Sequence, residues 1–360
     1  MKEISNDTTG FDTEAYFAAQ MDSFTARIDP SVPNVIEFGG KPFGDYHAAR
    51  VLPGYDPHVK ADIIQGLRDT MGRTELALVV NAQDLLHDPD GRRVAKRVRG
   101  DTQLTYDEEI LRMADQADRE FGLTVDNVVV SVVPRGLVPV NEDYLGGFAD
   151  RLAANFGRVH LLPKVDGYPN AIPDDQVVTR LTEVDPIAPH SNLVLMSAGG
   201  GSGKFGVAAS EIAHHLETGI VPNFIKFETF PVFALSEGHP LNQAFLAATA
   251  DLPNELTTLV NGLTNYSKDV ENLALLRQMI AQYPHLSTGR LEFVEPTDMG
   301  VNVIERGITD VGIVAAACRA EIGRRITRYE QEVSRGVEVP DTLTRTQQYA
   351  AHLALDQLIA

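Results

Sequence analysis

The sequence predicts an α/β protein with a mainly parallel sheet, flanking helices and a helical C-terminal region. Short apolar and β-branched runs alternate with amphipathic segments through the first two thirds of the chain, which favours strands alternating with helices. One run enters a glycine-rich loop that opens a helical segment, a pattern typical of a βαβ unit. After Pro240 the apolar residues follow helical spacing only.

The N-terminal half contains four expected strands. The first helix is indicated by Phe17, Met21 and Phe24, which recur at helical spacing before Asp29 and Pro30. Taken in order, the expected helices are 12–28, 58–70, 107–121 and 141–155, and the expected strands are 34–38, 75–81, 127–133 and 158–162. This alternation predicts parallel strand pairing.

A Pro-rich connection from 163 to 189 marks a candidate domain boundary. We therefore expect an N-terminal α/β domain over 1–185, a βαβ unit over 186–265 that continues the same sheet or forms a second lobe, and a helical region over 266–360. The later expected elements are strands at 192–197 and 223–227 and helices at 204–218, 241–249, 267–282, 310–332 and 343–358. Ligands of open parallel sheets bind beyond the carboxyl ends of the strands.

Composition limits the classes of function. With 360 residues, 43% hydrophobic and 22% charged, the chain reads as globular rather than collagen-like, coiled-coil or disordered. Its 50 acidic residues exceed the 31 basic ones by 19, which disfavours nucleic acid and anionic membranes as partners. Cys318 is the only cysteine, so no intrachain disulfide can form. The polar first ten residues and the lack of a long apolar run lead us to expect a cytoplasmic protein without a membrane segment.

The strongest local motif is the glycine-rich loop, which follows the apolar run Leu193–Met196. Glycines let backbone N–H groups converge on an anion, the following helix adds positive partial charge, and a lysine can reach phosphate oxygens. The P-loop match is imperfect, because Ala198 stands at its first glycine and Phe205 at its Mg²⁺-binding Ser or Thr. A tight turn that needs positive φ is the alternative. The candidate phosphate ligands are Gly199, Gly200, Gly201, Ser202, Gly203 and Lys204.

A second group of polar residues follows the first expected strand. His47 and Asp45 are candidate acid–base residues, and Lys41 and Arg50 are candidate anion ligands. Loops at this position carry function in parallel sheets. A structural network of ion pairs is the alternative interpretation.

The third group lies at the end of the strand that follows the glycine loop. Strand alternation puts Lys226 and Glu228 on one face, where they would pair with each other or orient a substrate or Mg²⁺. A buried salt bridge is the alternative.

The leading hypothesis is an enzyme that handles a small phosphorylated molecule or a nucleotide. In it, the loop binds phosphate and the second and third groups complete a cleft at the carboxyl edge. The cofactor is not identified, although carboxylate oxygens suit Mg²⁺. The competing hypothesis is a non-catalytic sensor of a nucleotide or anionic metabolite. Ile322, Ile326 and Tyr329 recur at helical spacing and make the C-terminal region a candidate homo-oligomer interface.

Several strings, taken in order, resemble an uncharacterised bacterial family that carries domain of unknown function 1846, also named uncharacterised protein family 0371. The matching strings include 37–56, 197–204, 226–231, 239–252 and 296–302. The resemblance implies the α/β architecture and no established activity. It also implies longer relatives, which continue into a further C-terminal α/β subdomain, and a glycine loop that lacks the P-loop Ser or Thr.

Overall fold

A computed structural model describes residues 9–85, 104–134, 157–169, 171–199, 201–227, 238–248, 264–336 and 340–355, and the single positions 147, 150, 235, 250 and 338. Most of the expected helix 141–155 lies outside these residues. The strands are β1 Asn34–Phe38, β2 Thr74–Asn81, β3 Asn127–Val133, β4 Arg158–Pro163, β5 Asn192–Ser197, β6 Asn223–Phe227 and β7 Gly300–Val301.

The helices are α1 Thr13–Arg27, α2 Tyr46–Val51, α3 Val59–Met71, α4 Ala82–Leu85, α5 Tyr106–Phe121, α7 Val177–Leu181, α8 Lys204–Glu217, α9 Pro240–Ala248, α10 Thr264–Ala281, α11 Val311–Ser334 and α12 Pro340–Leu355. The helices α1, α3, α5 and α8 to α12 agree with predicted ones to within a few residues, whereas the short helices α2, α4 and α7 were not predicted. Short 3₁₀ turns cover Asp174–Gln176, Gly289–Leu291, Pro296–Met299 and Ile304–Gly307.

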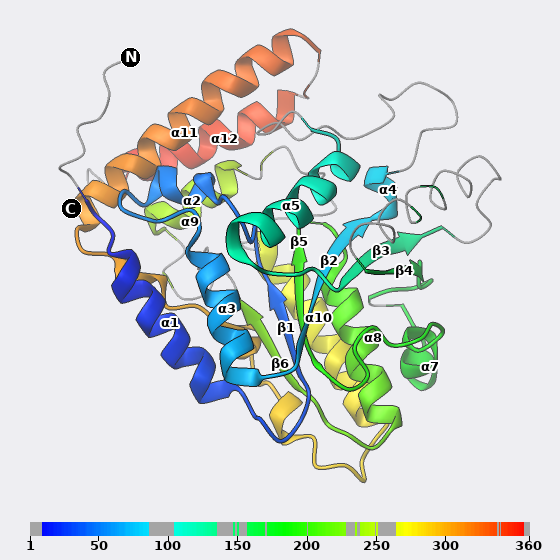
Figure 1. The fold of residues 1–360 in the computed structure, drawn as a ribbon. Coiled ribbons are helices and arrows are strands. Elements are labelled where there is room, and N and C mark those ends of the chain that lie inside the picture. The colour runs from blue at the N-terminus through cyan, green and yellow to red at the C-terminus, as the bar shows by residue number, and fades with distance from the viewer. Residues whose placement is uncertain are drawn as a thin grey trace.

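One parallel sheet of seven strands forms the centre of the molecule (Figure 1), in the order β4-β3-β2-β5-β1-β6-β7. The predicted α/β class with a parallel sheet and a helical C-terminal region is confirmed. β5 comes late in the sequence yet lies between β2 and β1. The glycine-loop βαβ unit therefore contributes strands to the same sheet as the N-terminal elements.

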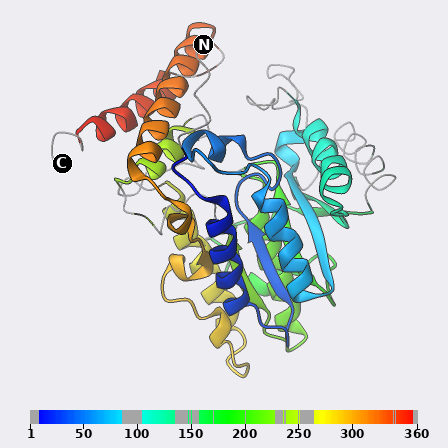
Figure 2. The ribbon, with the colours of Figure 1, turned by 60° about the vertical axis from the view of Figure 1, so that its left-hand side comes forward.

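The central strands alternate their side chains between two buried faces, whereas the edge strand β4 is exposed or half-buried along its length. Ile36, Val194 and Ile225 belong to a core with α1, α3 and α5, whereas Val35 and Leu195 belong to a core with α7, α8 and α10. Figure 2 shows α1 and α3 together on one side of the sheet. Helices on both faces explain why the strands read as continuous apolar runs.

The carboxyl edge of the sheet is the upper edge in Figure 1, to which the arrowheads of β2 and β5 point. Helices α2, α9 and α12 all pack against α11 at this end. Cys318 of α11 is fully buried there, as expected for a small core residue.

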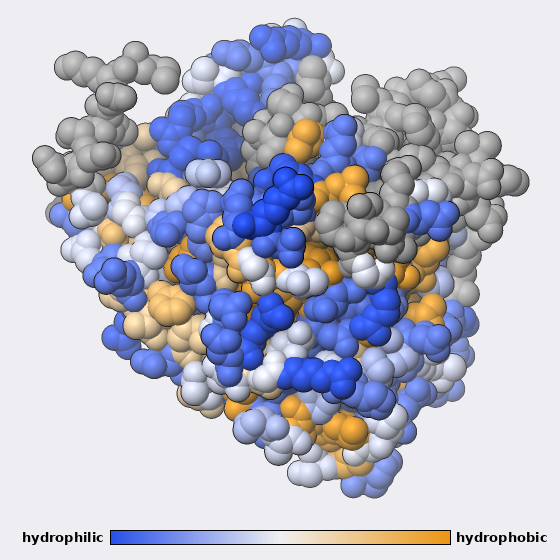
Figure 3. Space-filling view, in the orientation of Figure 1, coloured by the Kyte–Doolittle hydropathy of each residue, from blue (hydrophilic) through white to orange (hydrophobic). Residues whose placement is uncertain are grey.

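The molecular face in Figure 3 is mainly hydrophilic, with hydrophobic residues in small groups among charged ones. In the part of the chain that the structure describes, no helix combines the length and apolarity needed to cross a bilayer.

Helix α8 is anchored by a buried carboxylate. Glu211 is 1% exposed, and its carboxylate accepts hydrogen bonds from the backbone N–H groups of Ile187 and Ala188. Ser210 of the same helix donates a hydrogen bond of 2.7 Å to the carbonyl of Leu181. These contacts hold the connection between α7 and β5 against α8. Burial raises the pKa of Glu211 to about 7, although the two backbone hydrogen bonds favour the charged form.

This raised pKa predicts a pH-dependent loss of stability. A carboxyl whose folded pKa exceeds its unfolded value contributes stability below the unfolded pKa and loses it as pH rises through about 7. Glu211→Gln cannot ionise at this position. Raising the pH from 4 to 8 should therefore lower the free energy of unfolding of wild type by about 3 kcal/mol more than that of the variant. Urea unfolding at several pH values measures this difference. Parallel pH profiles for the two proteins would contradict the assignment.

Candidate functional site at the carboxyl edge

Five neighbouring strands end in polar side chains on the same face of the sheet. Earlier in three of these strands, the buried residues Val35, Val79 and Leu195 lie on this face. Because side chains alternate along a strand, residues two positions further on share that face. The polar row comprises Glu37 of β1, Asn81 of β2, Ser131 of β3, Ser197 of β5 and Lys226 of β6. The row therefore lies on the α8 side of the sheet, where the glycine loop begins.

Three members of this row bind carbonyl groups of the glycine loop. Asn81 Nδ2 donates to the Gly201 carbonyl at 3.0 Å. Ser131 Oγ donates to the Ser202 carbonyl at 2.5 Å, and Ser197 Oγ donates to the Gly199 carbonyl at 2.8 Å. In a trans peptide the N–H points opposite to the carbonyl. The N–H groups of Ser202 and Gly203 therefore point away from Asn81 and Ser131.

Ser202 and Lys204 are buried in the loop. Ser202 is 6% exposed, and in the described part of the chain its Oγ has no hydrogen-bond partner. Lys204 is 8% exposed and donates a hydrogen bond of 2.7 Å to Ser197 Oγ. A buried hydroxyl without a partner loses its hydrogen bonds to water, which makes Ser202 a candidate donor to a ligand.

Gly203 ends the loop and is the N-cap residue of α8. Its φ is +86°, and a Cβ at this position would lie 2.5 Å from Ser131 Oγ. Opposite it, β3 shifts register against β4 at Val132, whose φ of +56° is unusual for a β-branched residue. Glycine is thus required here by both conformation and close approach.

A cavity of about 530 Å³ opens beside the loop. Ser202, Lys204 and Glu37 contribute polar groups to its lining. The segment 162–169 and residues near α7 contribute apolar side chains together with the charged Lys164, Arg180 and Glu183. Ligand pockets in proteins commonly measure about 300–1,000 Å³ and combine an apolar lining with a few polar groups. The cavity therefore has the size and lining of a small-molecule site.

Lys226 lies at the end of β6 and pairs with α10. Its Nζ is 2.5 Å from Asp269 Oδ1, which also accepts a hydrogen bond of 3.1 Å from Asn272 Nδ2. Asn272 lines the cavity, so the pair supports one of its walls. Glu228 and Gly200, two of the sequence-predicted site residues, lie outside the described residues.

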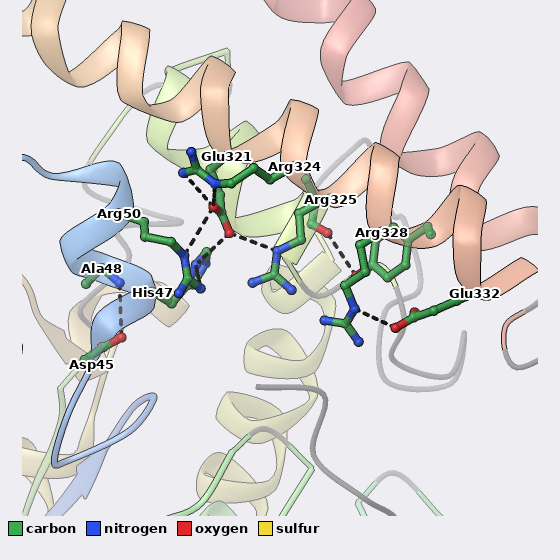
Figure 4. A network of polar contacts seen from close by, with 11 residues as sticks. Asp45, His47, Ala48, Arg50, Glu321, Arg324, Arg325, Arg328 and Glu332 are labelled. Carbon is green, nitrogen blue, oxygen red and sulfur yellow. Dashed lines mark hydrogen bonds and ion pairs between the residues drawn. The ribbon is translucent and has the colours of Figure 1, made fainter. Parts of the chain in front are cut away.

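The members of the second sequence-predicted group are held by ion pairs and hydrogen bonds, and Figure 4 shows those of Asp45, His47 and Arg50. Asp45 caps α2 by accepting a hydrogen bond from the Ala48 N–H, and it pairs with Lys60 Nζ at 2.8 Å. Burial would raise the pKa of Asp45, but the charge and hydrogen bond of Lys60, together with His47 and the Ala48 N–H, outweigh burial and lower this pKa. Lys41 Nζ lies 4.0 Å from Glu109 Oε1. These pairs fix the loop after β1 to α3 and α5.

Glu321 of α11 joins α2 to the C-terminal helices. It lies 3.5 Å from His47 Nδ1 and 3.2 Å from Arg50 Nε. Arg324 and Arg325 of its own helix also bind its carboxylate. Burial would raise the pKa of Glu321, but His47, Arg325 and Arg50 hold it well below its usual range. Burial also lowers the pKa of His47, so this imidazole is neutral near pH 7.

The structure does not bring all the sequence-predicted residues together. Lys226 pairs with Asp269, and Gly199 accepts a hydrogen bond from Ser197 without contributing to the described lining. Of those described, Gly201, Ser202, Gly203 and Lys204 line the cavity. The second group, Lys41, Asp45, His47 and Arg50, is bound into the network around α2 and does not contribute to the described lining.

Sequence reasoning did not select several residues that the geometry brings to the site. Asn81 and Ser131 are the polar ends of buried strands and bind the loop. Glu37 and Tyr168 line the cavity. The alternation of side chains along each strand could have indicated that Glu37, Asn81 and Ser131 face the same side of the sheet. It becomes informative only once the strand order and register are known.

Gly203→Ala should destabilise the chain. The added Cβ would meet Ser131 Oγ and would require a non-glycine residue at φ +86°, so we expect a loss of about 2 kcal/mol in the free energy of unfolding. Gly206→Ala is the matched control, because its Cβ would make an ordinary contact of 3.6 Å with Tyr168 and alanine favours the helix. Urea unfolding compares the two variants, and equal effects would count against a special role for Gly203.

Comparison with known proteins identifies the family. Residues 9–353 match the family model described as "Domain of unknown function DUF1846, N-terminal". The chain is 34% identical over 334 residues to proteins named "UPF0371 protein" from Streptococcus pneumoniae strain CGSP14 and from serotype 19F strain G54. Each alignment covers 90% of this chain and 62% of the relative, so the chain spans about three fifths of the length of these relatives. The chain belongs to the DUF1846 family, also named UPF0371, whose function is unknown.

Proposed function

We propose that this chain binds a phosphorylated small molecule or nucleotide in the glycine-loop cavity and acts on it as an enzyme. The observation that supports this most directly is the way in which the loop is held. Asn81 and Ser131 bind the carbonyls of Gly201 and Ser202, so the N–H groups that follow point away from these side chains. Successive N–H groups turned to one side form a concave anion site.

The helix that follows the loop adds to this preference. α8 has 14 residues and a glycine at its N-cap, so no cap side chain accepts hydrogen bonds from its first turn. Its N-terminus carries a positive partial charge of about half an elementary charge, which favours phosphate. The Ser202 hydroxyl and the Lys204 ammonium lie in the same cavity lining. Together they provide a neutral donor and a cationic donor for phosphate oxygens.

The site differs from a standard P-loop in its handling of metal. Phe205, at the position of the Mg²⁺-binding Ser or Thr, is a core residue whose ring centroid lies 5.9 Å from that of Phe224. In the described ranges, no three His, Cys, Asp or Glu side chains gather as a metal site. Mg²⁺ commonly binds through one or two carboxylates together with substrate phosphates. Glu37 is the buried carboxylate in the lining that would fill this role.

A non-catalytic sensor is the second candidate function. The contacts that favour it are the Asp45–Lys60 pair, which joins the N-cap of α2 to α3, and the Glu321 contacts, which join α2 to α11 of the helical region. Such a connection would carry a signal from the edge of the sheet to α11. In this alternative, the same cavity binds the ligand without changing it.

Removal of the Ser202 hydroxyl tests the phosphate site. Ser202→Ala should leave the free energy of unfolding unchanged, because Ser202 Oγ has no partner among the described residues. Its affinity for phosphate ligands should fall about tenfold through the loss of one hydrogen bond to a charged group. A thermal-shift screen of inorganic phosphate, sugar phosphates and nucleotides, with and without Mg²⁺, finds the ligand, and calorimetric titration then measures the affinity.

Two further variants complete this experiment. Lys204→Met should weaken binding more strongly, since it removes a charge from the cavity. Ser334→Ala is the control, because this hydroxyl bonds the Gln331 carbonyl at the end of α11 and should not affect binding. Unchanged affinity in both Ser202→Ala and Lys204→Met would overturn the proposed site.

Turnover separates the enzyme from the sensor. Wild-type protein should convert the ligand found in the screen, and mass spectrometry should detect the product. Glu37→Gln should bind the same ligand but convert it at least about 100-fold more slowly, through the loss of an acid–base or metal-binding carboxylate. A ligand that binds tightly to wild type and is recovered unchanged, with and without Mg²⁺, would favour the sensor.

A further inference from the structure

The cavity beside the glycine loop is too large for a phosphate group alone. Its volume of about 530 Å³ lies in the range of sites for drug-sized ligands, about 300–1,000 Å³. One water molecule occupies about 30 Å³ in the liquid, so a phosphate group of a few heavy atoms would fill only a small part of the space. The remaining volume must suit the rest of the ligand.

Part of the cavity lining is apolar and includes a tyrosine ring, while Lys164, Arg180 and Glu183 contribute charged side chains. Leu162, Val165 and Val184 contribute to this apolar part, together with Tyr168. The Tyr168 side chain is about one third exposed, at 36%, so part of it remains available to a ligand. A flat ring would bury apolar surface against Tyr168 and the aliphatic side chains beside it.

Tyr168 also lies beside the phosphate-binding end of α8. Its Cζ and Oη atoms would be 3.6 Å from a Cβ placed on Gly206, which belongs to the first turn of that helix. The ring therefore covers a part of the helix that has no side chain, two residues after Lys204. A ligand with its phosphate at the loop would bring its adjoining group next to Tyr168.

Two polar groups of the lining suit the hydroxyl groups of such a ligand. Glu37 and Asn272 line the same cavity, and they offer a carboxylate and an amide to hydroxyl groups. Phosphate at the glycine loop, hydroxyls near Glu37 and a flat ring on Tyr168 together describe a nucleotide.

We infer that the ligand of this cavity is a nucleotide, whose base stacks on Tyr168, rather than a sugar phosphate. This inference rests on the proposed function, because it assumes that the phosphate group binds at the glycine loop. Base–aromatic stacking tolerates different bases, so the apolar part of the lining selects a nucleotide over smaller phosphates without fixing which base is bound.

The experiment compares four probes on the full chain: inorganic phosphate, ribose 5-phosphate, adenosine 5′-monophosphate and uridine 5′-monophosphate. Calorimetric titration of wild type should give at least about tenfold tighter binding for a nucleoside monophosphate than for ribose 5-phosphate. Tyr168→Ala should remove this advantage and leave the affinity for ribose 5-phosphate and for inorganic phosphate unchanged. Tyr168→Phe should keep the tighter binding of the nucleoside monophosphates, because the phenyl ring can still stack on the base.

The outcomes distinguish this inference from the proposed function. Equal affinities for ribose 5-phosphate and both nucleotides would overturn the nucleotide assignment and leave the phosphate site standing. The same conclusion would follow if Tyr168→Ala weakened all four probes equally. Failure of all four probes to bind wild type would overturn both proposals. Urea unfolding of each Tyr168 variant confirms that the compared proteins are folded.

Discussion

A parallel sheet covered on both faces leaves its strand ends as the place where polar side chains can gather. Both faces of this sheet are buried in apolar cores, and a polar group in either core would need a hydrogen-bond partner. At the carboxyl edge the partners are the carbonyl groups of the glycine loop, which Asn81, Ser131 and Ser197 bind. The arrangement of the cavity depends on this constraint, because the strand ends that satisfy the loop also determine which way it faces.

The two polar groups at this edge are built differently. Around Glu321, a carboxylate that is 2% exposed contacts His47, Arg50, Arg324 and Arg325. Breaking such a buried pair leaves unpaired charge and is costly, so its evident role is to hold α2 against α11. At the glycine loop, by contrast, the Ser202 hydroxyl is buried without a partner in the described residues. The satisfied charges around Glu321 explain a supporting role, and the buried Ser202 hydroxyl is the observation on which the proposed binding site rests.

Much of the fold could be predicted from the sequence, because buried parallel strands form apolar runs between turn residues. β1, β3, β5 and β6 have the predicted bounds. The site was harder to predict than the fold. The loop was evident from its glycines, but Asn81 and Ser131 contact it only because β2 and β3 follow β5 in the sheet, in the direction of β4. Strand order depends on long-range packing that local pattern does not encode. The partner of Lys226 was missed for the same reason, since Asp269 is 43 residues away on α10.

The position of β5 bears on how the chain reaches its folded state during synthesis. β1 and β2 are not neighbours in the sheet, because residues 192–197 separate them and pair with both. A ribosome-bound chain that has emerged only as far as β4 therefore has two apolar strands whose central partner is still missing. Unpaired strand edges invite pairing with other chains. Until β5 emerges, the edges of β1 and β2 that face it in the folded sheet lack their partner, and the glycine loop that follows β5 cannot take its place between them and α8.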